Sequence, residues 1–264
     1  CIKVLDKGFV SLVDCMGDDS AIVQAARVSY GKGTKSVRED EGLIRYLLRH
    51  RHTSPLEMVE FKFHCRMPIF IARQWVRHRT ASINEMSARY SEMPDMFYEP
   101  DASAFTSQST LNKQGGTLDV VEGAEGFSSQ LRELHDESYA YYDSMLKAGV
   151  RREIARAALP ISLYTEWYWK IDLHNLLHFL ALRMDGHAQQ EIRDYANAIA
   201  EYVKEKVPLT WKAFQDYVVN SKSFSGRELE VIKNMLAGKT YSDEELVSAF
   251  GSMREAREFR EKLV

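Results

Sequence analysis

Cysteine is scarce in this sequence. The chain of 264 residues has three cysteines, Cys1, Cys15 and Cys65, an odd set without the paired spacing of metal or disulfide motifs. This excludes a disulfide framework and a zinc site built from thiolates. Cys65 lies in residues 59–67, which alternate apolar and polar side chains. Because it falls on the apolar side of this predicted strand, we expect a small buried side chain rather than a nucleophile.

Long apolar runs and an excess of positive charge are also missing. No apolar run approaches the length of about 18 residues that a membrane-spanning helix needs, and no charged-then-apolar leader opens the chain. We therefore expect a cytoplasmic protein with neither a membrane span nor a signal peptide. The net charge of -3 argues against a nucleic-acid binder, because such proteins usually carry a basic excess. The expected anionic partner is small.

Two motifs of cofactor and metal enzymes are absent as well. The chain has no Gly-x-Gly-x-x-Gly fingerprint, so a nucleotide cofactor would be held by another geometry. It also has no His-Glu-x-x-His motif. A metal-dependent hydrolase is still an alternative, because His174 and His178 are four residues apart and His187 follows. Arg183 would repel such an ion, and no metal is expected.

The composition that remains is that of an ordinary globular protein, with 45% hydrophobic and 28% charged residues. Its length allows one large domain or two small ones. Alternating or β-prone segments predict strands at 2–14, 59–67 and 163–170. Helical periodicity predicts helices at 20–30, 37–50, 127–146, 151–159, 172–184, 188–206, 227–236 and 243–262. The expected fold class is α+β, with a mixed or antiparallel sheet and long helices packed on it.

Single residues and biased segments divide this pattern. Ser20 and Asp172 are expected N-caps, and Pro208 is expected to end the helix at 188–206. Residues 99–126, rich in small and polar side chains, predict an irregular loop that is either a functional lid or disordered. The tail 221–264 predicts a helical appendage for packing or oligomer contact, whose mixed charge gives no basic DNA-recognition face.

The most unusual stretch is residues 77–90. It begins with Arg77, His78 and Arg79, ends with Arg89 and Tyr90, and has no apolar periodicity. A solvated basic loop is the simpler interpretation, and an RNA-binding module is a second one that the net charge does not favour. The stretch follows directly on apolar residues 68–76, however, which would anchor its guanidinium groups for phosphate or carboxylate.

The spacing within this stretch resembles the signature of the flavin-dependent thymidylate synthases. The matching positions are Arg77, His78, Arg79, Ser82, Asn84, Ser87, Arg89 and Tyr90. Further similar runs are residues 25–29, 52–57, 152–156, 159–160, 182–183, 187–189 and 191–192, and residues 112–115 resemble a run found in part of the family. The resemblance covers about residues 1–217. It implies a catalytic domain at 1–220 and leaves 221–264 as an appendage.

The resemblance implies the reductive methylation of dUMP to dTMP without a cysteine nucleophile. The carbon donor would be 5,10-methylenetetrahydrofolate, and the hydride would come from FAD that NADPH reduces. A homotetramer with active sites shared between subunits is implied as well. Neither a nucleic-acid polymer nor a membrane is an expected partner.

The resemblance also implies which residues bind dUMP. These are Gln74, Trp75, Val76, Arg77, Glu85, Met86, Ser87, Ala88, Arg89, Arg156 and Arg183. Arg183 is the expected catalytic residue, because a cation held against the pyrimidine would favour the N3-deprotonated ring and enrich C5. Ser87 is assigned to binding, since an alcohol with no base beside it is a poor nucleophile.

A second implied set binds FAD. It comprises His52, Ser54, Arg77, His78, Arg79, Glu85, Asp172, Leu173, His174 and His178. At positions 172, 174 and 178 this sequence has Asp, His and His where other members have Asn, Arg and Asn.

Overall fold

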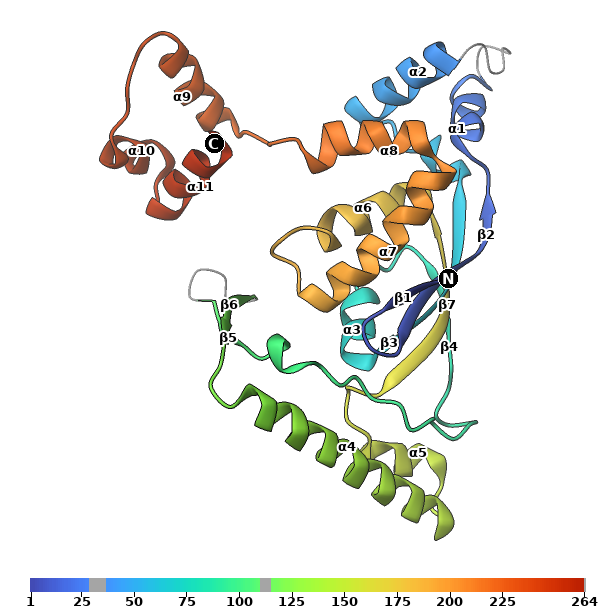
Figure 1. Cartoon of the computed structure of the whole chain (residues 1–264). Coiled ribbons are helices and arrows are strands. Elements are labelled where there is room, and N and C mark those ends of the chain that lie inside the picture. The colour runs from blue at the N-terminus through green and yellow to red at the C-terminus, as the bar shows by residue number, and fades with distance from the viewer. Residues whose placement is uncertain (29–36, 110–114, 264) are drawn as a thin grey trace. The chain divides into compact units, whose positions relative to one another are not determined.

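The computed structural model describes residues 1–28, 37–109 and 115–263. They form two compact units, Cys1–Phe214 and Gln215–Val264 (Figure 1). The boundary between these units lies a few residues before the one expected at 220/221. The assignment of the first unit as the catalytic domain and of the second as an appendage stays a prediction.

A five-stranded antiparallel sheet forms the centre of the first unit, in the order β1-β2-β3-β7-β4. Its strands are β1 (Ile2–Val4), β2 (Gly8–Met16), β3 (Glu60–Pro68), β4 (Ser82–Glu85) and β7 (Tyr164–Asp172). The longest regular pairing joins β3 to β7, from Glu60 opposite Asp172 to Pro68 opposite Tyr164, without a shift in register. The expected α+β class is confirmed.

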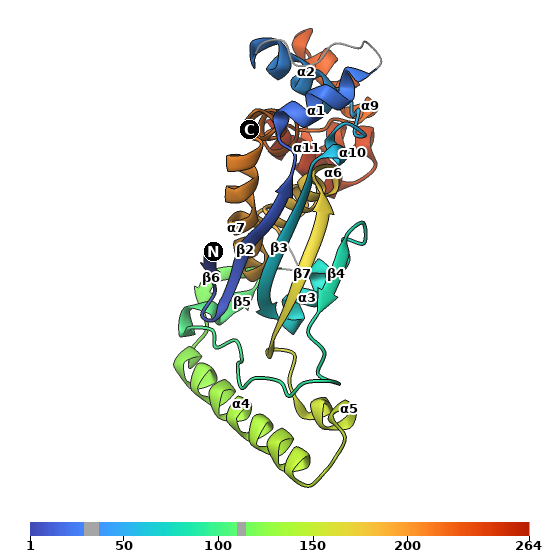
Figure 2. The ribbon, with the colours of Figure 1, turned by 90° about the vertical axis from the view of Figure 1, so that its right-hand side faces the viewer.

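The helices of this unit are α1 (Asp19–Ala26), α2 (Val37–Arg49), α3 (Ile69–Trp75), α4 (Ala124–Lys147), α5 (Arg152–Ala155), α6 (Leu173–Arg183), α7 (Gln190–Lys206) and α8 (Pro208–Phe214). Helices α3, α6 and α7 contact the sheet and lie on one side of it (Figures 1 and 2). Across the described residues, no helix is both long and apolar enough to cross a bilayer.

An aromatic layer fills the space between the sheet and these helices. Alternation along β7 turns Trp167 and Trp169 to the helix side. Trp75 of α3 meets both indoles edge-on, with ring centroids 5.4 and 5.1 Å apart. Phe179 of α6 stacks on Trp75 at 5.1 Å. Burying one such side chain contributes about 1.5–3 kcal/mol, so this layer fixes α3 and α6 against β7.

Cys65 of β3 is fully buried, as expected, opposite Trp167 in the neighbouring strand. The other face of the sheet is polar. There Glu166 contacts His64 Nε2 at 2.6 Å and Arg66 Nε at 2.8 Å through its two carboxylate oxygens.

Three local expectations for the first unit, one N-cap and the extents of two helices, are corrected, and the expected role of Pro208 is confirmed. Asp18 rather than Ser20 caps α1, because its carboxylate accepts from the backbone N–H groups of Ser20 and Ala21 at 2.8 and 3.3 Å. The helix ends at Ala26, and its expected last residues, 29–30, lie outside the described part of the chain. Pro208 ends α7, and it also begins α8. Proline is tolerated at the first helical position, because the N–H of that residue makes no hydrogen bond within the helix. The expected helix 151–159 shortens to α5 and a tighter turn, Arg156–Ala158.

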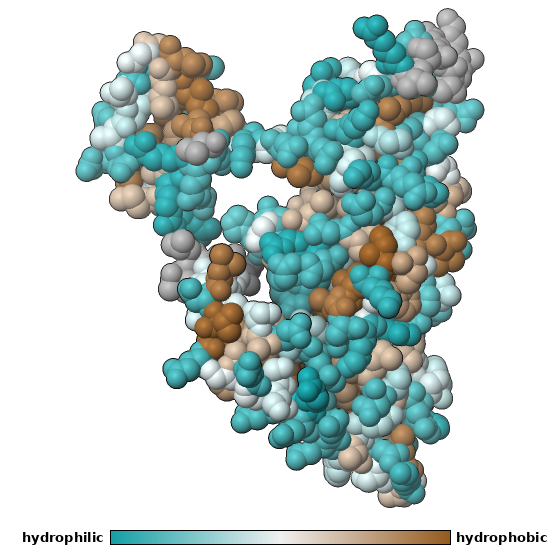
Figure 3. Space-filling model, viewed as in Figure 1, coloured by the Kyte–Doolittle hydropathy of each residue, from teal (hydrophilic) through white to brown (hydrophobic). Residues whose placement is uncertain are grey.

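The expectation of an irregular loop at 99–126 is also wrong. A short turn, Ala102–Ala104, leads into a hairpin of β5 (Thr106–Gln108) and β6 (Gly116–Val120). Residues 110–114, which include most of the 112–115 run, lie outside the described residues. Figure 3 shows a hydrophobic patch over this hairpin, where Leu118 is 97% exposed.

The second unit contains α9 (Gly226–Leu236), α10 (Asp243–Phe250) and α11 (Met253–Leu263). Val231, Leu246, Phe250 and Phe259 form its own core. The single helix expected at 243–262 is wrong. Gly251 stands between α10 and α11 at a φ of 87°, a left-handed conformation that favours glycine and ends a helix.

Gly8 provides a test of the packing between the sheet and α7. A Cβ at this position would collide with the hydroxyl of Tyr195 and lie 2.7 Å from the Val4 carbonyl oxygen and 2.9 Å from that of Arg66. We expect Gly8→Ala to lower the free energy of unfolding by about 1–3 kcal/mol. Gly126→Ala is the control, because a Cβ there meets open space in α4, and it should stabilise by about 0.5–1 kcal/mol. Equal denaturation midpoints for Gly8→Ala and the wild type would contradict this packing.

Candidate active site

A cavity of about 380 Å³ lies between the residues that follow α3 and one side of α6. Its lining consists of Arg77, His78, Arg79, Thr80, Ile171, Asn175, His178, Leu182 and Arg183. Trp75 anchors the end of α3, so the segment 77–80 leaves the aromatic layer at a fixed place. Five of the residues expected to bind dUMP or FAD thus meet in one cavity, although the sequence separates them by about a hundred positions.

Helix α6 brings its residues to the cavity by its periodicity. Leu173, Leu176, Phe179 and Leu180 are fully buried, so the positions between them face away from the core. Asp172 caps the helix as expected, accepting from the backbone N–H of Asn175 at 2.9 Å.

Arg183 and His78 are in direct contact. The guanidinium Nε donates to His78 Nε2 at 3.0 Å, and one Nη donates to the Gln74 carbonyl at 3.4 Å. Burial, with added repulsion from Arg183 and His178, lowers the pKa of His78 to about 4. At neutral pH the imidazole is therefore neutral, and its proton sits on Nδ1, because Nε2 accepts. The guanidinium is held by two acceptors instead of moving freely.

The cavity suits an anionic ligand with a flat ring. Arg77, Arg79 and Arg183 offer guanidinium donors for phosphate or a ring oxygen, while Ile171 and Leu182 supply apolar contact. This combination of convergent polar groups with apolar walls is typical of nucleotide and cofactor pockets. The donor set therefore fits a flavin nucleotide.

Gln74 and Glu85 do not line this cavity, and each is held by a partner to which sequence analysis gave no role. The Gln74 amide donates to the side-chain carbonyl of Gln189, which precedes α7. Thr165 of β7 donates its hydroxyl to Glu85 Oε1 at 2.6 Å. The sequence could have indicated Thr165, because side chains two residues apart in a strand lie on the same side. Thr165 is thus a hydroxyl on the side of β7 that carries Trp167 and Trp169.

A second group of expected residues lies outside this cavity. Met86 and Ala88 pack against a cluster that includes Ala155 of α5, and the Met86 N–H donates to the Glu166 carbonyl at 2.9 Å. Arg89, which follows, and Arg156, which follows α5, are exposed. Ser87 accepts from the Arg89 N–H through its hydroxyl at 3.3 Å.

The remaining expected residues are dispersed or buried. His52 and Ser54 are exposed in the turn between α2 and β3, and the short helix Leu56–Met58 that follows contacts α6. His174 is half-buried on α6. The side chains of Trp75 and Leu173 are fully buried, so these two positions could contact a ligand only through the backbone. Val76, next to Trp75, is exposed.

The described residues contain no group of three or more His, Cys, Asp or Glu side chains that could hold a metal ion. His187, which the metal alternative required, instead contacts Asp185 through Nδ1 at 2.7 Å.

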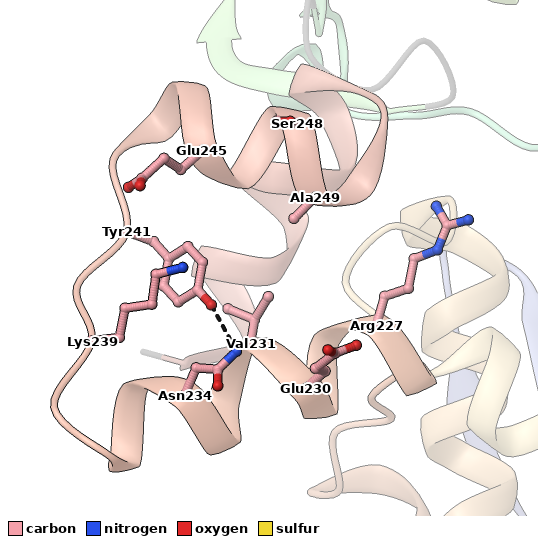
Figure 4. A pocket seen from close by; sticks show the side chains of 9 residues that line it. All are labelled: Arg227, Glu230, Val231, Asn234, Lys239, Tyr241, Glu245, Ser248 and Ala249. Atoms are coloured by element: carbon pink, nitrogen blue, oxygen red, sulfur yellow. Dashed lines mark hydrogen bonds between the residues drawn. The ribbon is translucent and has the colours of Figure 1, made fainter.

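The second unit has a cavity of its own, of about 540 Å³. Figure 4 shows its lining, in which Asn234 donates to the Tyr241 hydroxyl at 2.9 Å and Lys239 lies 4.4 Å from the centroid of the Tyr241 ring. Arg227 and Lys239 are balanced by Glu230 and Glu245, and no expected site residue takes part. The cavity beside α6 is therefore the better candidate.

The lowered pKa of His78 predicts a pH dependence of stability. The imidazole has an ordinary value of 6.5 in the unfolded chain and about 4 in the folded protein. Between these values the unfolded chain binds more protons, so stability is greatest above pH 6.5 and falls as the pH drops toward 4. His78→Gln keeps an acceptor for Arg183 but cannot titrate. The variant should therefore lack the part of the stability loss between pH 6.5 and 4 that comes from His78. Denaturant unfolding across the range is the measurement, and identical profiles for the two proteins would contradict the neutral imidazole.

Comparison with known proteins identifies the family. A family model described as "Thymidylate synthase complementing protein" matches residues 11–209. The chain is 56% identical over 250 residues to a flavin-dependent thymidylate synthase of Thermus thermophilus, a match that covers 95% of this chain and 90% of that protein. A protein of the same name from Dictyostelium discoideum is 55% identical over 241 residues, covering 88% of this chain and 79% of that protein.

The fold is similar to that of a solved nucleotide methylase. The crystal structure of the UMP/dUMP methylase PolB from Streptomyces cacaoi, bound with 5-Br dUMP, aligns with a TM-score of 0.75 and 34% identity, covering 84% of this chain and 100% of that one. The resemblance expected from residues 77–90 is thereby confirmed. Because the family model spans most of the chain and relatives of similar length share more than half of its residues, this protein belongs to the flavin-dependent thymidylate synthase family.

Proposed function

We propose that this enzyme methylates dUMP to dTMP, with 5,10-methylenetetrahydrofolate as the carbon donor and NADPH as the reductant of a bound FAD. Family membership supports the reaction. The observation that carries the proposal is the Arg183–His78 contact at 3.0 Å, at the wall of a cavity that Arg77 and Arg79 also line. That cavity offers fixed positive charge where an anionic nucleotide and a flavin would meet.

Arg77, Arg79, His78 and His178 are the proposed holders of the flavin, because they line the cavity with donors for phosphate and ring oxygens. When bound, FAD would supply hydride chemistry, which no protein side chain can provide. Asp172 and His174 at the start of α6, with His52 and Ser54 in the neighbouring turn, are proposed to extend this set.

Arg183 is proposed to act on the pyrimidine. A guanidinium stays protonated at neutral pH, and its contacts with His78 and the Gln74 carbonyl fix it before substrate arrives. A preorganised cation beside the ring would stabilise negative charge at N3 and O4 and so increase electron density at C5. Gln74, with its amide already oriented by Gln189, is proposed to bind a base or ribose edge.

The substrate phosphate is proposed to bind Arg89 and Arg156. Both are exposed and lie outside the cavity that Arg183 lines. This separation supports the proposal of a homotetramer, in which the exposed arginines of one subunit would complete the site of another.

The direct test is dTMP formation by the purified protein with dUMP, methylenetetrahydrofolate and NADPH. Product should form in the complete mixture and disappear when any single component or the flavin is removed. Formation of dTMP by flavin-free protein, or none by fully loaded protein, would refute the proposed reaction.

Arg183→Lys tests the role of the planar guanidinium. Lysine keeps the charge but loses the fork that contacts His78 and Gln74, so methyl transfer should fall by about 100- to 1000-fold. Flavin reduction by NADPH should survive, because that step need not involve the pyrimidine. Arg132→Lys on α4, an exposed arginine paired with Glu99, is the matched control. Near-normal dTMP formation by Arg183→Lys would remove Arg183 from the chemistry.

Replacing all three cysteines tests the absence of a thiol nucleophile. Burial raises the pKa of Cys65, and its side chain has no access to solvent. We expect the triple Ala or Ser variant to form dTMP at a rate near that of the wild type, with a loss of stability of about 1 kcal/mol for the small core truncation. If product formation vanished while flavin content and folding persisted, a thiol would have to be part of the reaction.

A further inference from the structure

Thr165 carries a hydroxyl in an otherwise apolar layer. The residue is only 2% exposed and lies on the side of β7 that turns Trp167 and Trp169 toward the helices. A buried hydroxyl is unfavourable unless it is hydrogen-bonded. Its partner is Glu85 Oε1, at 2.6 Å.

Glu85 is a carboxylate on the edge strand β4 of the sheet, opposite Trp167. Its side chain is exposed, and among the described residues Thr165 is its hydrogen-bond partner. An ionised carboxylate only accepts hydrogen bonds, through two oxygens. With Oε1 tied to Thr165, Oε2 is left as an oriented acceptor at the edge of the sheet.

We propose that Thr165 is a positioning residue for substrate binding: it holds Glu85 so that the free carboxylate oxygen accepts a hydrogen bond from a hydroxyl or N–H group of dUMP. The inference rests on the proposed function, and the family resemblance implies that Glu85 contacts dUMP or FAD. The backbone N–H of Met86, the next residue, donates to the Glu166 carbonyl of the same strand. Strand β7 therefore fixes both the side chain of Glu85 and the backbone that follows it. Without the Thr165 hydroxyl, the Glu85 side chain would move freely until dUMP binds. Its loss of conformational entropy would then oppose binding, and the affinity for dUMP would fall.

Thr165→Val and Thr165→Ser separate the hydroxyl from the shape of the side chain. Valine keeps the branched form that suits a strand, whereas serine keeps the donor. Thr210→Val is the matched control, because Thr210 is also buried and donates its hydroxyl to a carboxylate, Asp19 Oδ1, at the same 2.6 Å. That pair joins α8 to α1, and neither Thr210 nor Asp19 is among the residues expected to bind dUMP or FAD.

The measurement is dUMP affinity by calorimetry on the FAD-loaded protein, together with flavin content and the free energy of unfolding of each variant. Thr165→Val should weaken dUMP binding by about 2- to 10-fold, the effect of leaving one side chain to be immobilised on binding. It should raise KM for dUMP more than it lowers kcat. Thr165→Ser should bind within about twofold of the wild type. Thr210→Val should keep wild-type affinity even where it is as destabilised as Thr165→Val.

The outcomes distinguish this inference from the function on which it rests. Wild-type protein that fails to bind dUMP would overturn the proposed function and the inference together. If the wild type binds dUMP and Thr165→Val binds it with the same affinity, the inference alone would be overturned. Equal weakening in Thr165→Val and Thr210→Val would reduce the effect to general destabilisation, and loss of flavin with dUMP affinity intact would assign Glu85 to the cofactor.

Discussion

The pairing of β3 with β7 is the constraint on which the rest of the first unit, Cys1–Phe214, depends. Its register runs unbroken from Glu60 opposite Asp172 to Pro68 opposite Tyr164, so alternate side chains of both strands face the helices together. Trp75 packs on the tryptophans of β7, and Phe179 packs on Trp75. The segment that leaves α3 and the helix that follows β7 are thereby brought to opposite walls of one cavity. The site is a consequence of this aromatic layer.

Sequence patterns were sufficient where the structural cause is local. The alternation of residues 59–67 predicted β3 and the burial of Cys65, and the leucine spacing after Asp172 predicted α6 and its cap. Strand β4 was missed because its four residues are all exposed and show no alternation. It exists as a strand because it pairs with β7, about eighty residues away. The break at Gly251 was missed because glycine is permitted, not required, to leave a helix.

The candidate site shows the same division. The resemblance could name Arg183 and His78 as site residues, but not that one donates to the other, because α3 and α6 meet only through the folded core. It included Gln189 in a similar run without giving it a role, and it did not include Thr165. Their hydrogen bonds to Gln74 and Glu85 are visible only in the folded structure. The resemblance also gathered Arg89 and Arg156 into the same set as Arg183, whereas the structure places them outside the cavity that Arg183 lines. Residue identity thus came from the sequence, and geometry came from the fold.

We propose that the flavin and the pyrimidine share the cavity between residues 77–80 and α6. The most direct test is a titration of the FAD-loaded protein with dUMP, followed through the visible absorption of the oxidised flavin. A shared cavity predicts a saturable change in the flavin spectrum, with a midpoint equal to the dissociation constant of dUMP measured by calorimetry. Binding of dUMP that leaves the flavin spectrum unchanged would contradict the account.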